Sequence, residues 1–257
     1  MRQRNDGPIQ DEKLKFAVER WCLWEPQTDT PALCSQYSRG IKSSESLDKP
    51  DLATVPAMQR RRLGTLARSV FHVLTRCTDP GAQEPAIFSS HMGEIGRTQG
   101  ILDTLAADEP VSPASFSLSV HNAIAGQWSL IRGIRAPMVA LAPPANSPVP
   151  ALLEAAGILA EDEYEAVNVV FYDEPYPTFY SPFMEGPAAV TALALRLVVA
   201  GAEQREGVLY FRVTRLSPFG SEPDLRDNHS ALADLLLGRH HITRVLEHQC
   251  AWHLERC

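Results

Sequence analysis

The stretch Pro113-Ala-Ser-Phe-Ser-Leu-Ser-Val-His-Asn-Ala-Ile-Ala-Gly126 decides how the rest of the chain is interpreted. In Phe116–Val120, large apolar side chains alternate with serines, which is typical of a short strand. Small helix-forming residues follow Asn122, so the sequence predicts a strand-to-helix elbow with Asn122 at the amino end of the helix. Free backbone N–H groups at such an elbow stabilise an anion or a nucleophile. Many acyl-transfer enzymes carry Cys or Ser at this point, whereas this chain carries an amide.

The composition is that of an acidic globular protein. Of 257 residues, 44% are hydrophobic and 21% are charged, and the formal net charge is −7. This length allows one large or two small domains with a substantial core. The negative charge argues against nucleic acid as a partner, because phosphate binding needs a basic face. The short basic run Arg60–Arg62 is interpreted as a solvated helix flank.

The cysteines and the amino-terminal residues bear on the compartment. The chain has five scattered cysteines without a Cys-x-x-Cys pair, and its start does not resemble a secretory leader, so we expect a cytoplasmic protein. No apolar run approaches the ~20 residues of a membrane-spanning helix, so no transmembrane segment is expected. Residues 1–12 are polar and are expected to be disordered or tag-like, and residues 13–257 are expected to form a single domain.

Hydrophobic periodicity predicts alternating strands and helices. Strands are expected over 13–24, 85–90, 116–120, 136–142, 166–173, 189–199 and 207–216. Helices are expected over 63–74, 93–106, 122–133 and 147–159, and from 228 or 230 to 252. Residues 27–56 are predicted to be a long surface loop with a short helix near 32–37, and 174–187 an ordered loop. Strands 189–199 and 207–216 are predicted to form a hairpin. The fold class that follows is a layered α/β domain with a mainly parallel sheet plus a C-terminal hairpin and helix.

Several motifs occur together in one order along the chain. They are Arg60–Leu63, Phe88–Glu94, Ser112–Ala123, Tyr172–Pro175 and Glu185–Ala189. In this combination the sequence resembles the β-ketoacyl synthase-like chain length factors of aryl polyene gene clusters, over nearly the whole chain. Several motifs in the right order are more specific than any one of them. The resemblance implies a thiolase-like fold that corresponds to the amino-terminal half of a ketosynthase.

The resemblance also bears on catalysis. Ketosynthases of this fold carry their nucleophile in the pattern Ser-x-Ser-x-x-Cys-Ala, which falls on Ser117, Ser119, Asn122 and Ala123 of this sequence. An amide cannot form the acyl thioester that condensation requires, whereas a thiolate can. Asn122 is therefore a degenerate nucleophile position, with Ser119 and His121 as its neighbours, and no catalytic residue is expected.

Two histidines that ketosynthases take from their carboxyl-terminal half are also not expected, because the sequence is predicted to end before such a half. The remaining histidines are on or near the predicted terminal helix and are His229, His240, His241, His248 and His253. The resemblance thus implies a catalytically inactive subunit, without cofactor or metal. It implies a heterodimer with an active ketosynthase subunit, with acyl carrier protein as a further partner. In that complex the subunit limits acyl or polyene chain length sterically, because a blocked tunnel cannot accept another two-carbon unit.

Other interpretations of the same residues stay open at this stage. Ser119, His121 and a carboxylate such as Asp173 or Glu174 are the residue types of a hydrolase triad, which would make the chain a stand-alone acyl-thioester hydrolase. Asn122 is able to stabilise an enolate, as in a malonyl decarboxylase, or simply to cap its helix.

Two alternatives involve no catalysis. The tail Cys250-x-x-His253-x-x-x-Cys257 contains zinc-ligand residue types, with His240 or His241 as a fourth ligand, although an ordinary helix end is the preferred interpretation. A scaffold that never binds acyl chains also agrees with the sequence.

Overall fold

A 15-residue strand, β1 (Lys13–Gln27), is the centre of the fold. The computed structural model describes residues 13–27, 30–144, 147–161, 163–184, 186–201, 203–215, 228–247 and 250–257. A strand was predicted at this position, with Pro26 as its end. The strand continues to Gln27 instead, and its register shifts between Glu25 and Gln27, which is how a strand accommodates a residue that has no N–H to donate.

The strand β1 pairs with three others because it is long enough to have different neighbours along its length. One edge pairs with β7 (Thr191–Val198). The other edge pairs first with β8 (Leu209–Arg215) and then with β2 (Thr30–Ser38). The strand order is β5-β4-β6-β7-β1-β8-β10-β9, with β2 and β3 (Ile41–Leu47) as a branch from β1.

The parallel part of the sheet is formed by β5 (Met138–Leu141), β4 (Ala86–Ser89) and β6 (Ala166–Asp173). The parallel arrangement predicted for these segments is confirmed. The other described strand pairs are antiparallel, so the sheet is mixed. All of β6 is buried, as its continuous apolar sequence predicted for a strand covered on both faces. The strand β5 is at one end of the strand order.

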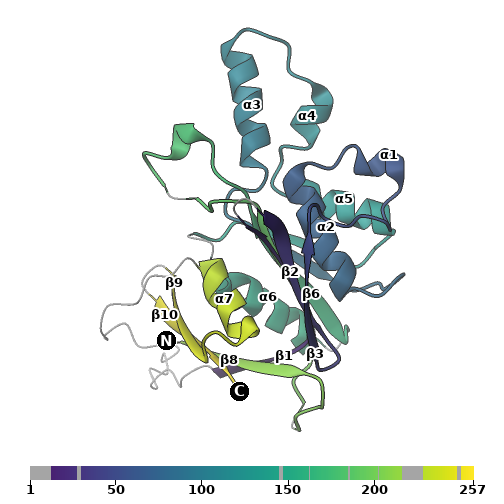
Figure 1. Ribbon diagram of the computed structural model, residues 1–257, viewed down its shortest axis with the longest axis vertical. Helices are drawn as coiled ribbons and strands as arrows, with labels where there is room; N and C mark the ends of the chain where they lie inside the picture. The colour runs from purple at the N-terminus through teal and green to yellow at the C-terminus, as the bar shows by residue number, and fades with distance from the viewer. Residues whose placement is uncertain are drawn as a thin grey trace, which may run out of the picture.

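Two helical layers cover the sheet (Figure 1). On one face, α2 (Thr65–Cys77) and α5 (Ala123–Arg132) pack on a core that includes Cys22 and Trp24 of β1. On the other face, α6 (Val149–Ala160) and α7 (Asn228–Leu237) pack on a core that includes Trp21 and Leu23. Side chains of a strand point alternately to its two faces, so β1 contributes to both cores.

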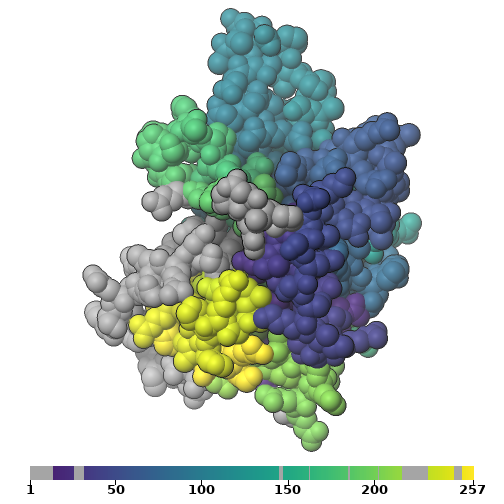
Figure 2. Space-filling model, in the orientation of Figure 1, coloured from purple at the N-terminus to yellow at the C-terminus, as the bar shows by residue number. Residues whose placement is uncertain are grey.

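The remaining helices lie at the margins. The helix α3 (Ile95–Ala106) was predicted at nearly this position, and with α4 (Pro113–Ser117) it stands out from the body of the molecule (Figures 1 and 2). The short α1 (Ala57–Arg60) precedes α2, and a 3₁₀ turn, Thr178–Tyr180, lies in the predicted ordered loop. None of the helices among the described residues has the length and apolar character that a membrane span requires.

The predicted hairpin of residues 189–199 and 207–216 is wrong in its pairing. Both strands are present as β7 and β8, but β1 lies between them and pairs with each. The physical reason is that β1 is apolar on both faces and therefore gains most from a central position. That gain depends on contacts that are distant in the sequence.

The predicted terminal helix is also wrong beyond Leu237. Gly238 has a φ of 76°, which ends α7 in the left-handed conformation that glycine favours. The chain then forms an antiparallel hairpin of β9 (Ile242–Glu247) and β10 (Cys250–Arg256), so Trp252 is on a strand. A C-terminal hairpin and helix are thus present, in residues other than those predicted.

The predicted surface loop of residues 27–56 is an antiparallel hairpin for much of its length. The strands β2 and β3 are joined at Arg39 and Gly40, whose φ values are 50° and 81°, as a two-residue hairpin turn requires. The strand β3 is largely exposed, so it has no apolar alternation that would reveal it. Serines link the strands instead, for example Ser35 Oγ to Ser44 Oγ at 3.0 Å. The prediction for residues 1–12 falls outside the described residues.

Candidate functional site

The segment before Asn122 is a short helix and a turn, and the predicted strand 116–120 is wrong. Ser112 is the N-cap of α4, its side-chain oxygen accepts the backbone N–H of Ser115 at 3.4 Å, and Pro113 follows it at the start of the helix. These are helix-start signals that outweigh the alternating pattern. Phe116 and Val120 are 61% and 47% exposed, so the alternating apolar side chains do not face a core.

The amino end of α5 is where the sequence predicted it, directly after Asn122. Asn122 is the N-cap residue by position, and its backbone carbonyl accepts the N–H of Gly126 at 3.0 Å. Its side chain is exposed and makes no capping hydrogen bond to any described residue. The helix therefore starts at a residue whose amide group is directed to the surface.

His121 attaches this elbow to the edge of the sheet. Its Nε2–H donates to the carbonyl of Leu141, the last residue of β5, at 2.9 Å. His91 does the same from the other side, since its Nδ1–H donates to the carbonyl of Pro143 at 2.9 Å. A Cβ at Gly93 would lie 3.1 Å from His121 Nδ1, so the glycine allows a close approach. The elbow, the loop after β4 and the end of β5 thus meet at the carboxyl end of the parallel strands.

A buried carboxylate holds the loop after β4 in place. Asp173, the last residue of β6, accepts the Ser90 hydroxyl at 2.9 Å and the His91 backbone N–H at 3.1 Å. Ser90 Oγ in turn accepts the backbone N–H of Gly93 at 2.8 Å. Since Asp173, Ser90 and Gly93 are all buried, these bonds fix the loop rather than bind a ligand.

Two further carboxylates fix the start of α3. Glu174 accepts the backbone N–H of Gly96 at 2.9 Å, and burial raises the pKa of its carboxyl. Glu94 forms an ion pair with Arg97 at 3.2 Å. Acidic groups at a helix amino end are stabilised by the free N–H groups there. The loop and α3 are therefore held by structural carboxylates, and the motif Tyr172–Pro175 supplies two of them.

The hydrolase-triad interpretation finds little support in this geometry. The Ser119 hydroxyl donates to the carbonyl of Phe116 at 2.8 Å, within the turn after α4. His121 donates its Nε2–H to Leu141, and Asp173 accepts from Ser90 and His91. A triad needs the serine proton directed to the histidine, and here it is directed to a backbone carbonyl.

The tail residues suggested as zinc ligands are spread along a strand. Cys250 and His253 belong to β10, and Cys257 follows it. A strand rises about 3.3 Å per residue, so the first and last of these residues lie roughly 20 Å apart. His253 Nε2 also accepts from Arg244 Nε at 2.8 Å, and burial lowers the pKa of its ring. One metal ion cannot reach all three residues.

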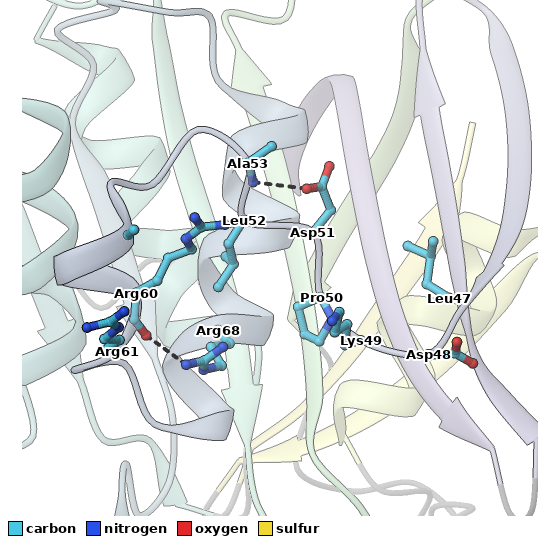
Figure 3. A pocket seen from close by; sticks show the side chains of 11 residues that line it. Leu47, Asp48, Lys49, Pro50, Asp51, Leu52, Ala53, Arg60, Arg61 and Arg68 are labelled. Atoms are coloured by element: carbon cyan, nitrogen blue, oxygen red, sulfur yellow. Dashed lines mark hydrogen bonds between the residues drawn. The ribbon is translucent and has the colours of Figure 1, made fainter.

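A cavity of about 700 Å³ lies away from the elbow residues, between the end of β3 and helices α1 and α2 (Figure 3). Its lining is mostly polar and charged: Leu47, Asp48, Lys49, Pro50, Asp51, Leu52, Ala53, Ala57, Arg60, Arg61 and Arg68. Arg68 already donates to the carbonyls of Arg60 and Leu63, so its guanidinium stabilises the connection between α1 and α2. The basic run noted in the sequence borders this cavity.

Sequence reasoning passed over a buried group beside this cavity. Cys22, Cys34 and His72 lie on β1, β2 and α2, are 0% exposed, and bring their sulfur and nitrogen atoms within 4.8 Å of one another. The sequence contained one signal for this group: Cys22 and Trp24 are two residues apart, so they lie on the same face of β1. Because residues 27–56 were not predicted as strands, nothing brought Cys34 to that face.

The comparisons with known proteins agree with one another. A family model described as "Beta-ketoacyl synthase, N-terminal domain" matches residues 35–254. Among solved structures, the chain is similar to one in the complex of a ketosynthase (ApeO) with its chain length factor (ApeC) from Xenorhabdus doucetiae. The identity is 21%, the TM-score is 0.70, and the match covers 95% of this chain and 100% of that one.

A second similar structure is titled the ishigamide ketosynthase/chain length factor. The identity is 12% and the TM-score 0.54, over 88% of this chain and 72% of that one. No curated protein matches the sequence. The predicted thiolase-like fold of a ketosynthase is confirmed by these structural matches.

Proposed function

The chain belongs to the family of the β-ketoacyl synthase N-terminal domain, and from this premise we propose that it is a non-catalytic, ketosynthase-like chain length factor. It pairs with an active ketosynthase and limits the length of the acyl or polyene chain that the ketosynthase builds. The observation that carries this proposal is Asn122 at the amino end of α5. The resemblance puts the nucleophile at this residue, and its side chain is an amide, which cannot form a thioester.

The edge of the sheet supports the partner in this proposal. The strand β5 ends the strand order, and no other described strand pairs with its outer edge. Its residues are only partly buried. An unpaired edge is a template for another strand and is usually covered. Through the bond from His121 to Leu141, this edge is attached to the elbow, so one partner surface would cover both.

The two similar structures described above are of ketosynthases together with chain length factors. They support the same kind of partner here. The limit on chain length is the finer part of the proposal, and its physical basis is steric: a growing chain stops where the next unit would have to enter packed protein.

The partner is tested by cysteine footprinting at the elbow. We expect an Asn122→Cys protein to react rapidly with iodoacetamide when the chain is alone, because the side chain is exposed and sits at a helix amino end, which favours the thiolate. Co-expression with the ketosynthase from the same gene neighbourhood should give a co-eluting complex in which this thiol is protected. Glu203→Cys, at an exposed position outside the elbow, is the matched control and should react equally in both states.

Two outcomes would contradict the proposal. One is a chain that never co-elutes with the ketosynthase, and the other is a complex in which the cysteine at 122 reacts as fast as in the free chain.

Turnover of malonyl-carrier protein by the isolated chain, lost in Asn122→Ala, would instead support the decarboxylase alternative. The chain-length role is tested separately, by exchanging this subunit for another chain length factor with the ketosynthase held constant. Product length should change, and an unchanged length would remove that part of the proposal.

A further inference from the structure

The buried group of Cys22, Cys34 and His72 is outside the elbow and has no part in the proposed function. The sulfur atoms of Cys22 and Cys34 lie 3.6 Å apart, and Cys34 Sγ is 3.2 Å from His72 Nε2. All three residues are 0% exposed. The cysteines belong to neighbouring antiparallel strands, where Cys34 is opposite Trp24 and Cys22 is opposite Gln36. They are therefore diagonal neighbours on one face of the sheet, beneath α2.

The hydrogen bonds of His72 determine which of its nitrogens carries the proton. The backbone N–H of Asp51 donates to His72 Nδ1 at 2.8 Å. The guanidinium of Arg76, which is also only a donor, lies 3.0 Å from the same atom. Nδ1 must therefore be the acceptor, and the proton of the neutral ring is on Nε2. That proton points to Cys34, so His72 donates to the sulfur.

This tautomer argues against a metal ion, although the residue types are those of a thiolate–imidazole site. A metal on Nε2 would require the proton on Nδ1, where the Asp51 N–H and Arg76 already donate. The positive charge of Arg76 next to the ring further disfavours a cation. The same donors favour a negatively charged sulfur instead.

The two thiols differ in pKa, as a pair needs in which one sulfur attacks as the thiolate. Hydrogen bonds from Cys22 and from His72, with the positive charge of Arg76, lower the pKa of Cys34 although burial opposes this. Burial raises the pKa of Cys22 well above its ordinary value, and that of Cys77 to about 12. The charged or ionisable groups near Cys34 are thus Cys22 from β1 and His72, Arg76 and Cys77 from α2, with Glu45 of β3 paired to Arg76. Cys34 is the nucleophile of the group.

We propose that Cys22 and Cys34 are a dithiol that hydrogen peroxide oxidises to a disulfide between β1 and β2. In the first step the Cys34 thiolate attacks a peroxide oxygen, so an S–O bond forms, the O–O bond breaks and hydroxide leaves. The product is the Cys34 sulfenic acid. In the second step the Cys22 sulfur attacks the Cys34 sulfur, so the S–S bond forms, the S–O bond breaks and the hydroxide leaves with the Cys22 proton as water. Overall, the Cys34 thiolate, the Cys22 thiol, one peroxide and the one proton that the first hydroxide takes up give one disulfide and two waters.

The surroundings give peroxide a short route and make the bond reversible. Asp51 lines the 700 Å³ cavity of Figure 3 and donates its N–H to His72, whose other ring nitrogen contacts Cys34 Sγ, so the His72 ring links the lining of that cavity to the sulfur pair. Peroxide is nearly as small as water, so it needs little room to reach the sulfur atoms from this cavity. Diagonal positions across an antiparallel pair lie farther apart than opposite ones. The disulfide therefore forms with strain and is readily reduced again, as regulatory disulfides are.

The test is thiol mapping of the full chain under native conditions. Cys250→Ser and Cys257→Ser leave Cys22, Cys34 and Cys77 as the only cysteines. After peroxide treatment, denaturation and alkylation, we expect Cys77 alone to be alkylated, and the non-reducing peptide map to contain a Cys22–Cys34 peptide two hydrogens lighter than the sum of its reduced parts. Dithiothreitol should restore both thiols. Adding Cys77→Ala should leave the bond intact, and adding Cys34→Ser should leave the Cys22 thiol free.

His72 is a positioning residue here, and the pH profile of oxidation tests it. Adding His72→Gln should slow oxidation and move the rate–pH profile to higher pH, because the thiolate loses part of its stabilisation. Three results would overturn the proposal: both thiols still free at a peroxide concentration that oxidises cysteine in solution completely, a bond from Cys22 to Cys77, or sulfinic acid on Cys34 without a disulfide. The wild-type mapping decides the question even if a variant fails to fold.

Discussion

Replacing Gly64 by alanine tests the contact that anchors the projecting helix α3 to α2. Gly64 is the N-cap of α2, with φ −65° and ψ 170°, a conformation that alanine adopts without strain. A Cβ at this position would lie 2.5 Å from Glu94 Oε1 and 3.2 Å from a guanidinium nitrogen of Arg97. The cost of Gly64→Ala is therefore steric, and it arises at an ion pair rather than in the backbone.

The magnitude follows from how little room Glu94 has. Its side chain is only 7% exposed, so it cannot swing into solvent without breaking its bond to Arg97. An overpacked buried site costs roughly 1–3 kcal/mol. For a chain of this size each kcal/mol corresponds to roughly 2–4 °C. We expect Gly64→Ala to lower the melting temperature by about 2–12 °C, as measured by circular dichroism.

Gly100→Ala is the matched control, because Gly100 lies within α3 and has no described atom within 4 Å of an added Cβ. It should raise the stability by about 0.5–1 kcal/mol, since alanine favours a helix interior. In a Glu94→Ala background, Gly64→Ala should become neutral or stabilising, giving a coupling energy of at least about 1 kcal/mol. A Gly64→Ala protein as stable as wild type in the Glu94 background would refute the close contact.

Two other charged groups give further predictions. Burial raises the pKa of Glu174, so the stability it contributes is present below its unfolded pKa and is lost as the pH rises through its folded pKa. Glu174→Gln keeps an oxygen that accepts the Gly96 N–H. In urea unfolding it should therefore raise the free energy of unfolding more at about pH 7 than at about pH 4. The same difference between variant and wild type at both pH values would contradict this. Arg196 pairs with Glu84 at 2.6 Å, and both side chains are under a fifth exposed. Arg196→Met should cost about 2 kcal/mol or more in the same assay, whereas Arg212→Met, in a pair that is 40% and 44% exposed, should cost under about 1 kcal/mol. Equal losses for the two arginines would show that burial does not set the cost.

In α2 and β6, two elements that local sequence predicted correctly, the sequence pattern follows the burial of the side chains. In α2, Leu66, Val70 and Leu74 recur on one face and are all 0% exposed. In β6, every residue is buried, so an unbroken apolar run was enough. In both cases the pattern in the sequence repeats the pattern of burial, and the environment of the element could be predicted without its neighbours.

The errors occurred where the deciding contacts are distant in sequence or where the strand is exposed. Nothing in residues 189–216 indicates that β1 separates β7 from β8, because that position is set by pairs of residues that are 168 to 201 positions apart in the sequence. The strand β3 lacks a buried face, so its sequence does not alternate between apolar and polar residues and gives no strand signal. At the elbow, Ser112 and Pro113 carried a helix-start signal that the alternation of serines with apolar residues obscured. The start of the helix after Asn122 was nevertheless predicted correctly, because that helix is partly buried.

Asn122 stands at the start of α5, yet its side chain makes no capping hydrogen bond there to any described residue. An asparagine that serves only as a helix cap accepts an N–H of the first turn with its side-chain oxygen. Asn122 makes no such bond to a described residue, and its amide is exposed. Local helix stability therefore does not explain this residue. Next to it, His121 donates a hydrogen bond to the carbonyl of Leu141, the last residue of the edge strand β5. The segment before α5 is thereby attached to the unpaired edge of β5, which is the edge that the proposed complex would cover.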